Sequence, residues 1–163
     1  MSKNVTIWRV ENEYGCGPYN GRGNILGYFS AQARNEMQLS KYRPTPWKDE
    51  GLSQIFPRAS HFLSNQQYFS GFAKIKDYER WFSSDNFKYA LDATCFFLTR
   101  YSVPDDDVLF GRRQILLKMD RASITGFRRC NEVGVMLKKS DIAHKPIMRF
   151  LKSTDRQVEM PDL

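Results

Sequence analysis

Arg9 is the residue whose surroundings most suggest chemistry, because it lies within a stretch that we expect to be buried. Residues 4–11 read Asn-Val-Thr-Ile-Trp-Arg-Val-Glu, which predicts a strand with Ile7 and Arg9 on one face and further apolar residues on the other. A guanidinium on a buried strand needs a partner, either an internal carboxylate such as Glu11 or Asp92, or a bound anion. The sequence leaves both alternatives open.

Standard catalytic and metal-binding motifs are missing from the sequence. It contains no GxSxG, HExxH, CxxC or phosphate-loop pattern. The three cysteines, Cys16, Cys95 and Cys130, are widely spaced, and with only two histidines in the chain we expect no metal site. The three aspartates at 105–107 lack the glycine and terminal glutamate of a calcium loop, so we interpret them as a solvated turn.

The positive charge is concentrated in the last third of the chain. Residues 1–111 hold 13 Lys/Arg and 12 Asp/Glu, whereas residues 112–163 hold 12 and 6, which divides the net charge of +7 into +1 and +6. This bias favours an acidic partner, either nucleic acid or an acidic protein, although a basic face that only aids solubility is the alternative. The cations expected to contact nucleic acid are Arg128, Arg129, Lys138, Lys139, Lys145 and Arg149.

The elements that position these residues are predicted to form a single α+β domain. Its 163 residues, 41% of them hydrophobic, suffice for one core. We expect a central, mostly antiparallel sheet, with a core domain of residues 1–126 and a basic C-terminal segment of residues 127–163. The predicted strands lie near residues 4–11, 68–74, 94–103 and 108–119.

Residues 75–83 are predicted to form an amphipathic helix that packs on this sheet. Ile75, Tyr78, Trp81 and Phe82 recur at helical spacing, and core packing is the usual meaning of such an aromatic stripe. Residues 30–39 and 141–152 are compatible with two further helices.

No apolar run approaches the roughly 20 residues that a membrane span needs. The start of the chain has no secretory signal, so we expect a soluble protein in a reducing cytosol, without a membrane partner.

Several short motifs occur in an order that resembles a small family of tailed-phage accessory proteins. They are Trp-Arg-Val at 8–10, Gly-Pro-Tyr at 17–19, Gly-Phe-Ala at 71–73, Tyr-Ser-Val at 101–103 and Gln-Ile-Leu at 114–116. The same order is distantly similar to the ADP-ribosyltransferase fold over roughly residues 4–119.

The similarity to ADP-ribosyltransferases implies roles for four residues. Arg9, with Tyr19, would contact NAD as the cofactor, and Ser70 would stand near the family's serine. Gln114 would take the place of the catalytic glutamate. A glutamine can hydrogen-bond a ribose hydroxyl, but it cannot supply the carboxylate charge that stabilises the transition state. The resemblance therefore implies an architecture more strongly than an activity.

Two functions follow from these observations. The first is a phage accessory protein of the host cytoplasm, active in host takeover or against a host defence, which binds nucleic acid or an acidic host protein through a basic surface. The aromatic residues Tyr42, Trp47 and Tyr68 would then be available to stack on the bases of a single strand. The alternative is an NAD-dependent enzyme that modifies a host target.

Overall fold

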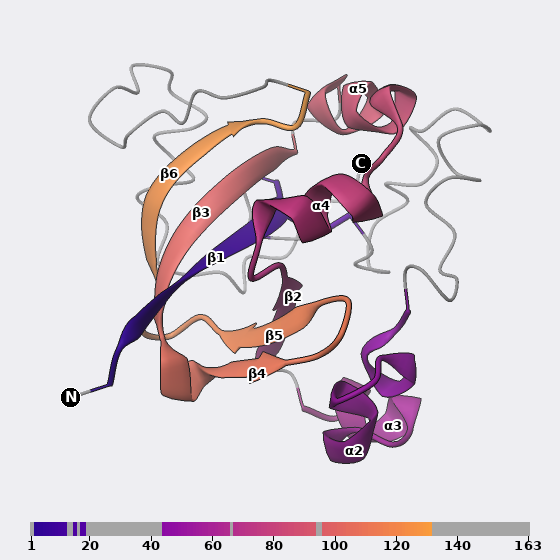
Figure 1. Cartoon of the computed structure of the whole chain (residues 1–163), viewed down its shortest axis with the longest axis vertical. Helices are drawn as coiled ribbons and strands as arrows, with labels where there is room; N and C mark the ends of the chain where they lie inside the picture. Colours follow the sequence, from indigo (N-terminus) through magenta and orange to yellow (C-terminus); the bar gives the residue numbers. More distant parts are fainter. Residues whose placement is uncertain are drawn as a thin grey trace. The chain divides into compact units, whose positions relative to one another are not determined.

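The computed structural model describes residues 2–12, 15, 17–18, 44–65, 67–93 and 96–131 (Figure 1). It is an α+β domain, which confirms the predicted class. The antiparallel strands are divided between two three-stranded sheets, whereas we expected one central sheet. Among the described residues, no helix combines the length and the apolar character that a membrane span requires.

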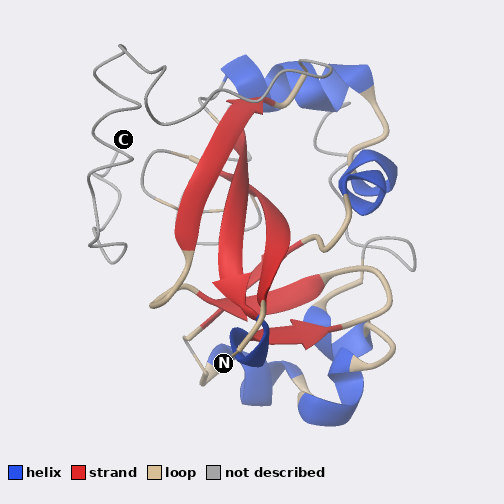
Figure 2. Cartoon of the chain, turned by 60° about the vertical axis from the view of Figure 1, so that its left-hand side comes forward, coloured by secondary structure: helices blue, strands red, loops and turns tan. Residues whose placement is uncertain are grey.

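The first sheet has the order β1-β3-β6, and Figure 2 shows its three long strands side by side. Its strands are β1 (Asn4–Glu11), β3 (Phe97–Pro104) and β6 (Ser123–Arg129). In β1 the side chains of Ile7 and Arg9 are both buried, as the alternating pattern predicted. β1 and β3 thus confirm two predicted strands, whereas β6 was not predicted and spans residue 126, where we expected the core domain to end.

The second sheet has the order β2-β5-β4, with antiparallel pairing throughout. Its strands are β2 (Tyr68–Gly71), β5 (Ile115–Lys118) and β4 (Val108–Phe110). The predicted strand at 108–119 is therefore two strands, which a turn at residues 111–114 separates. Trp8 of β1 and Phe72 exchange two backbone hydrogen bonds of 2.8 and 2.7 Å just beyond β2.

The described helices are short. They are η2 (Pro46–Lys48), α2 (Leu52–Ile55), α3 (Ala59–Leu63), α4 (Ile75–Trp81), α5 (Asp85–Ala93) and η3 (Asp105–Asp107). The predicted helix at 75–83 is confirmed by α4, and its aromatic stripe is a packing face, because the Trp81 ring centroid lies 5.6 Å from that of Phe72. The helices predicted at 30–39 and 141–152 lie outside the described residues.

The domain divides into two compact units, each assembled from three stretches of chain. The first comprises Met1–Arg9, Gln38–Ser83 and Tyr101–Ser123, and the second comprises Val10–Met37, Ser84–Arg100 and Ile124–Leu163. Both sets of ranges include residues that the structure does not describe.

In the first unit, Leu52 and Phe56 of α2 form an apolar cluster with Leu116 of β5. These residues are almost completely buried, which fixes the segment after η2 against the sheet. In the second unit, the Phe97 and Phe127 rings meet edge to face, with centroids 6.0 Å apart.

The aspartates of η3 differ from the solvated turn that we expected. Asp105 and Asp106 are exposed, but Asp107 is buried and accepts a hydrogen bond of 2.7 Å from Nε of Arg121. Asp106 accepts from the same guanidinium at 3.0 Å. These two contacts, that with Asp107 first, raise the pKa of Arg121 above its ordinary value. The expectation was wrong for Asp107, because an arginine 14 residues further along the chain binds it.

Candidate functional site

The turn between β4 and β5, residues 111–114 (Gly-Arg-Arg-Gln), presents two adjacent arginines. We call it the arginine turn. The N–H of Gly111 donates to the carbonyl of Gln114 at 2.9 Å, which closes the turn. A Cβ atom at Gly111 would collide with a carboxylate oxygen of Asp49 and lie 2.8 Å from Cδ1 of Leu52. Glycine at this position therefore permits the segment after η2 to approach the turn closely.

Asp49 binds the backbone of the arginine turn. Its side chain is buried, with the residue only 1% exposed, and its two oxygens accept the backbone N–H groups of Arg112 (2.5 Å) and Arg113 (3.0 Å). The N–H of Arg112 also donates to the carbonyl of Glu50 at 2.9 Å. A buried carboxylate that accepts two backbone donors is satisfied and fixes both residues, so the course of the backbone at the two arginines is defined.

Gln114 connects the arginine turn to the chain on the other side of η2, at Pro44. It is 5% exposed, and its side-chain nitrogen donates to the carbonyl of Pro44 at 2.6 Å. This amide therefore helps to anchor the turn. Its predicted role in place of a catalytic glutamate stays a prediction.

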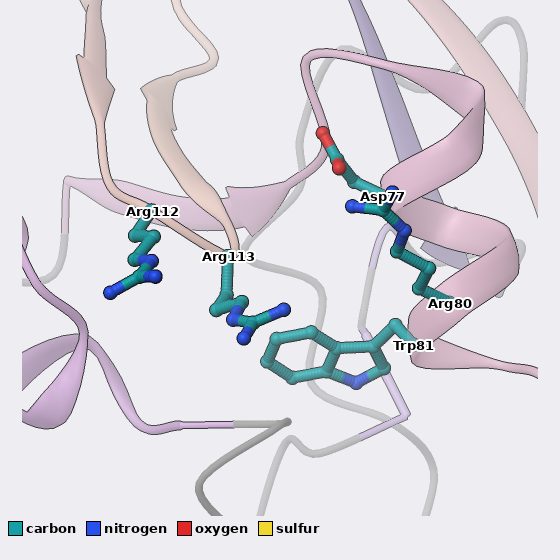
Figure 3. A pocket seen from close by; sticks show the side chains of 5 residues that line it. All are labelled: Asp77, Arg80, Trp81, Arg112 and Arg113. Carbon is teal, nitrogen blue, oxygen red and sulfur yellow. The ribbon is translucent and has the colours of Figure 1, made fainter.

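The two arginines line a small pocket together with Asp77, Arg80 and Trp81 of α4 (Figure 3). The cavity has a volume of about 30 Å³, which is enough for one or two water molecules. Figure 3 shows the Arg113 side chain extending toward the edge of the Trp81 ring, and Trp81 is itself buried.

The pocket is suited to binding an anion. Three arginines and one aspartate line it, so the lining carries a net charge of +2. Arg112 also pairs with Glu50, but the two side chains are 65% and 72% exposed, and such a pair contributes little. None of the five lining residues is a serine, cysteine or histidine, so the lining offers guanidinium donors and no ordinary nucleophile.

Arg9 and Ser70, both predicted as site residues, are in contact. Nη1 of Arg9 donates to the backbone carbonyl of Ser70, and the guanidinium carbon lies 5.1 Å from the centroid of the Phe69 ring. Arg9 is 5% exposed. The hydrogen bond and the cation–π contact therefore stabilise part of the charge of this buried guanidinium. Gln114 directly precedes Ile115, which pairs with Gly71, so all three predicted residues belong to the neighbourhood of β2 and β5.

The basic residues predicted to bind nucleic acid are only partly described. Arg128 is 8% exposed, whereas Arg129 is exposed, and both belong to β6. Tyr68, expected to be available for stacking, is half-buried and packs edge to face on Phe56, and its stacking on bases stays a prediction. The predicted residues that lie outside the described part are Tyr19, Tyr42, Lys138, Lys139, Lys145 and Arg149.

The sequence did carry a signal for the arginine turn, which our interpretation missed. A glycine and two arginines stand between the apolar runs Val-Leu-Phe and Ile-Leu-Leu, and this arrangement is typical of a hairpin with charges at its tip. Asp49 had no such local signal, because its hydrogen bonds span 63 and 64 residues of chain. In the part of the chain that the structure describes, no group of three or more His, Cys, Asp or Glu side chains could hold a metal.

Comparison with known protein families shows a match over most of the chain. A family model described as "Bacteriophage T4 Y00F protein" matches residues 1–131, which include every residue that the structure describes. No curated protein and no solved structure matches the chain. The similarity to ADP-ribosyltransferases therefore has no support from a solved structure.

Proposed function

The chain belongs to the bacteriophage T4 Y00F protein family, and on that premise we propose that it is a phage accessory protein that binds nucleic acid in the infected cell through its arginine turn. Within this proposal, the contacts are with phosphate groups and are independent of base sequence. The protein would act by occupying host or phage nucleic acid.

The observation that carries the proposal is the way Asp49 holds Arg112 and Arg113. Their backbone N–H groups are used by the buried carboxylate, so the two guanidinium groups are what the turn presents to a ligand. A guanidinium group can donate two parallel hydrogen bonds to the oxygens of one phosphate. An ordered backbone lowers the entropy lost on binding.

The composition of the pocket supports nucleic acid over an acidic protein as the partner. Four of its five lining residues are charged, and the remaining one, Trp81, is 6% exposed. Protein interfaces usually have an apolar centre with aromatic anchors, whereas nucleic-acid interfaces are polar and strongly positive. The overall charge of +7 agrees with a nucleic-acid interface.

The test compares binding of DNA and RNA at about 50 and 200 mM salt. Neutralising three phosphates would reduce the affinity roughly 40-fold over this range, because the logarithm of affinity falls with a slope of about 0.9 per phosphate. Replacing Arg112 and Arg113 with glutamine should reduce that slope by about 2. A double variant of Lys76 and Arg58, two exposed cations outside the pocket, is the matched control, because it loses the same charge.

Two results would contradict the proposal. Absence of binding at low salt would exclude nucleic acid and favour an acidic host protein as the partner. Equal losses of affinity and slope in the test and control variants would mean that binding depends on net charge and does not involve the arginine turn.

A further inference from the structure

One aromatic side chain is exposed directly beside the arginine turn. Of the Phe, Trp and Tyr side chains in the described part of the chain, only those of Phe110 (55%) and Tyr89 (62%) are more than half exposed. Phe110 is the last residue of β4 and immediately precedes the arginine turn. Because only one residue separates Phe110 from Arg112, their Cα atoms are at most about 7 Å apart. A ligand at the turn therefore has this ring within reach.

The Phe110 side chain is supported on the inner side of the sheet and open on the outer side. β4 is an outer strand of the second sheet (Figure 1), in which Phe110 pairs with Ile115 and Ile115 pairs with Gly71. Ile115 and Gly71 are buried, so this row of residues runs from the core to solvent at Phe110. Paired residues have Cβ atoms about 4.5–5.5 Å apart, which places Ile115 beside the aromatic side chain.

The backbone that carries the ring is held on both sides. Leu109, whose side chain points to the opposite face of the sheet, packs on the apolar cluster of the first unit. A Cβ atom added at Gly51 would lie 3.2 Å from the carbonyl oxygen of Phe110, so the segment after η2 approaches this strand closely. The ring therefore projects from an ordered element, which lowers the entropy lost when a planar ligand stacks on it.

The surroundings of the ring at the turn are polar. Residues 111–114 contain no apolar side chain larger than glycine, and Arg112 and Glu50 form an exposed ion pair beside it. The centre of a protein interface is apolar and poor in charged residues. Surfaces that bind single-stranded nucleic acid instead combine cations with aromatic rings on which bases stack.

A ring in this position distinguishes single strands from duplexes. Inside a duplex, neighbouring base pairs cover both faces of each base, so a surface ring cannot stack on it unless the base leaves the helix. A base of a single strand can stack on an aromatic side chain, which strengthens binding roughly tenfold or more per base and depends little on which base it is.

We infer that the nucleic acid bound at the arginine turn is single-stranded and that one of its bases stacks on Phe110. The inference rests on the proposed function and specifies the form of nucleic acid that is bound. Phe110 is not among the aromatic residues that we expected to stack on bases, which were Tyr42, Trp47 and Tyr68.

The experiment measures the affinity of the full chain for three DNA probes at about 50 mM salt. The probes are a short oligo(dT) strand, an abasic strand of the same length, and a duplex with the same total number of phosphates. The oligo(dT) strand should bind roughly tenfold more tightly than the abasic strand, which has the same phosphates but no bases, and more tightly than the duplex.

Three variants test whether Phe110 causes this preference. Phe110→Leu keeps an apolar side chain but removes the ring, so it should bind oligo(dT) only as tightly as the abasic strand, with an unchanged salt dependence. Phe110→Tyr keeps the ring and should keep the preference. Tyr89→Leu, which removes an exposed ring from the second unit, is the matched control and should also keep it. Unchanged binding of the abasic strand shows that each variant is folded.

The outcomes distinguish the inference from the proposed function. Salt-sensitive binding of oligo(dT) and the abasic strand with equal affinity, or tighter binding of the duplex, would overturn the inference and leave nucleic-acid binding in place. Failure of all three probes to bind would overturn both. A preference for oligo(dT) that persists in Phe110→Leu, or that Tyr89→Leu also abolishes, would overturn the role of Phe110.

Discussion

Replacing Asp49 with asparagine tests the central claim about the arginine turn. The carboxylate is buried and accepts two backbone N–H groups, those of Arg112 and Arg113. Asparagine has almost the same shape, but only one of its two terminal atoms can accept a hydrogen bond. The other carries two hydrogens and would face a backbone donor.

The expected loss of stability follows from these contacts. The N–H of Arg112 has a second acceptor, the carbonyl of Glu50 at 2.9 Å, so the asparagine oxygen would remain with Arg113. One charge-assisted bond is then lost and a second is weakened, which costs about 2 kcal/mol. For a chain of 163 residues this corresponds to a fall of roughly 4–8 °C in the thermal midpoint. Asp49→Ala leaves the N–H of Arg113 without this acceptor and should cost about 3 kcal/mol.

The assay is urea denaturation together with oligonucleotide binding. An exposed aspartate, Asp120, provides the control, because Asp120→Asn makes the same chemical change without burial. Asp49→Asn should lower both the free energy of unfolding and the affinity for nucleic acid, whereas Asp120→Asn should leave stability within about 0.5 kcal/mol. If Asp49→Asn were as stable as the unmodified chain and bound equally well, the reasoning about the turn would be refuted.

Three further changes have defined outcomes. Gly111→Ala forces a methyl group against Asp49 and should lower the free energy of unfolding by about 1–3 kcal/mol in urea titrations; an unchanged value would show that the turn can relax. Glu50→Gln removes the carboxylate that pairs with Arg112 and should raise nucleic-acid affinity about 1.4- to 5-fold, since exposed pairs contribute about 0.2–1 kcal/mol. A weaker complex would contradict a competing role for Glu50. Asp92→Asn, in the second unit, replaces one of the two oxygens that accept the backbone N–H groups of Cys130 and Asn131. It should cost about 2 kcal/mol in stability without altering oligonucleotide affinity at temperatures where the chain is folded.

The strands were the most predictable elements, because their signal is local. The alternation in residues 4–11 gave β1 with its observed bounds, and the aromatic spacing gave α4. The helices α2 and α3, with four and five residues, are too short to show a helical period. In α5, the buried residues Phe87 and Leu91 do stand four positions apart, a signal that we did not use.

The site was much less predictable than the fold, because tertiary contacts create it. The arginine doublet at 112–113 is visible in the sequence, but its value as a site depends on Asp49 and on Arg80, which lie 63 and 32 residues away (112 − 49 and 112 − 80). The spacing of apolar residues along the sequence does not indicate contacts between residues so far apart. The buried Arg9 shows the same limit, because one acceptor of its guanidinium is a backbone carbonyl, a group that every residue carries.

The order of the strands in the first sheet has a consequence for synthesis of the chain on the ribosome. β1 ends at residue 11, and its neighbour β3 begins at residue 97, so 86 residues (97 − 11) must be added before the two can pair. At about 5–20 residues per second this takes roughly 4–17 s. During that time the backbone groups of β1 cannot form their hydrogen bonds with β3, and its apolar residues lack this neighbouring strand. The first strand to be made is therefore exposed to pairing between nascent chains.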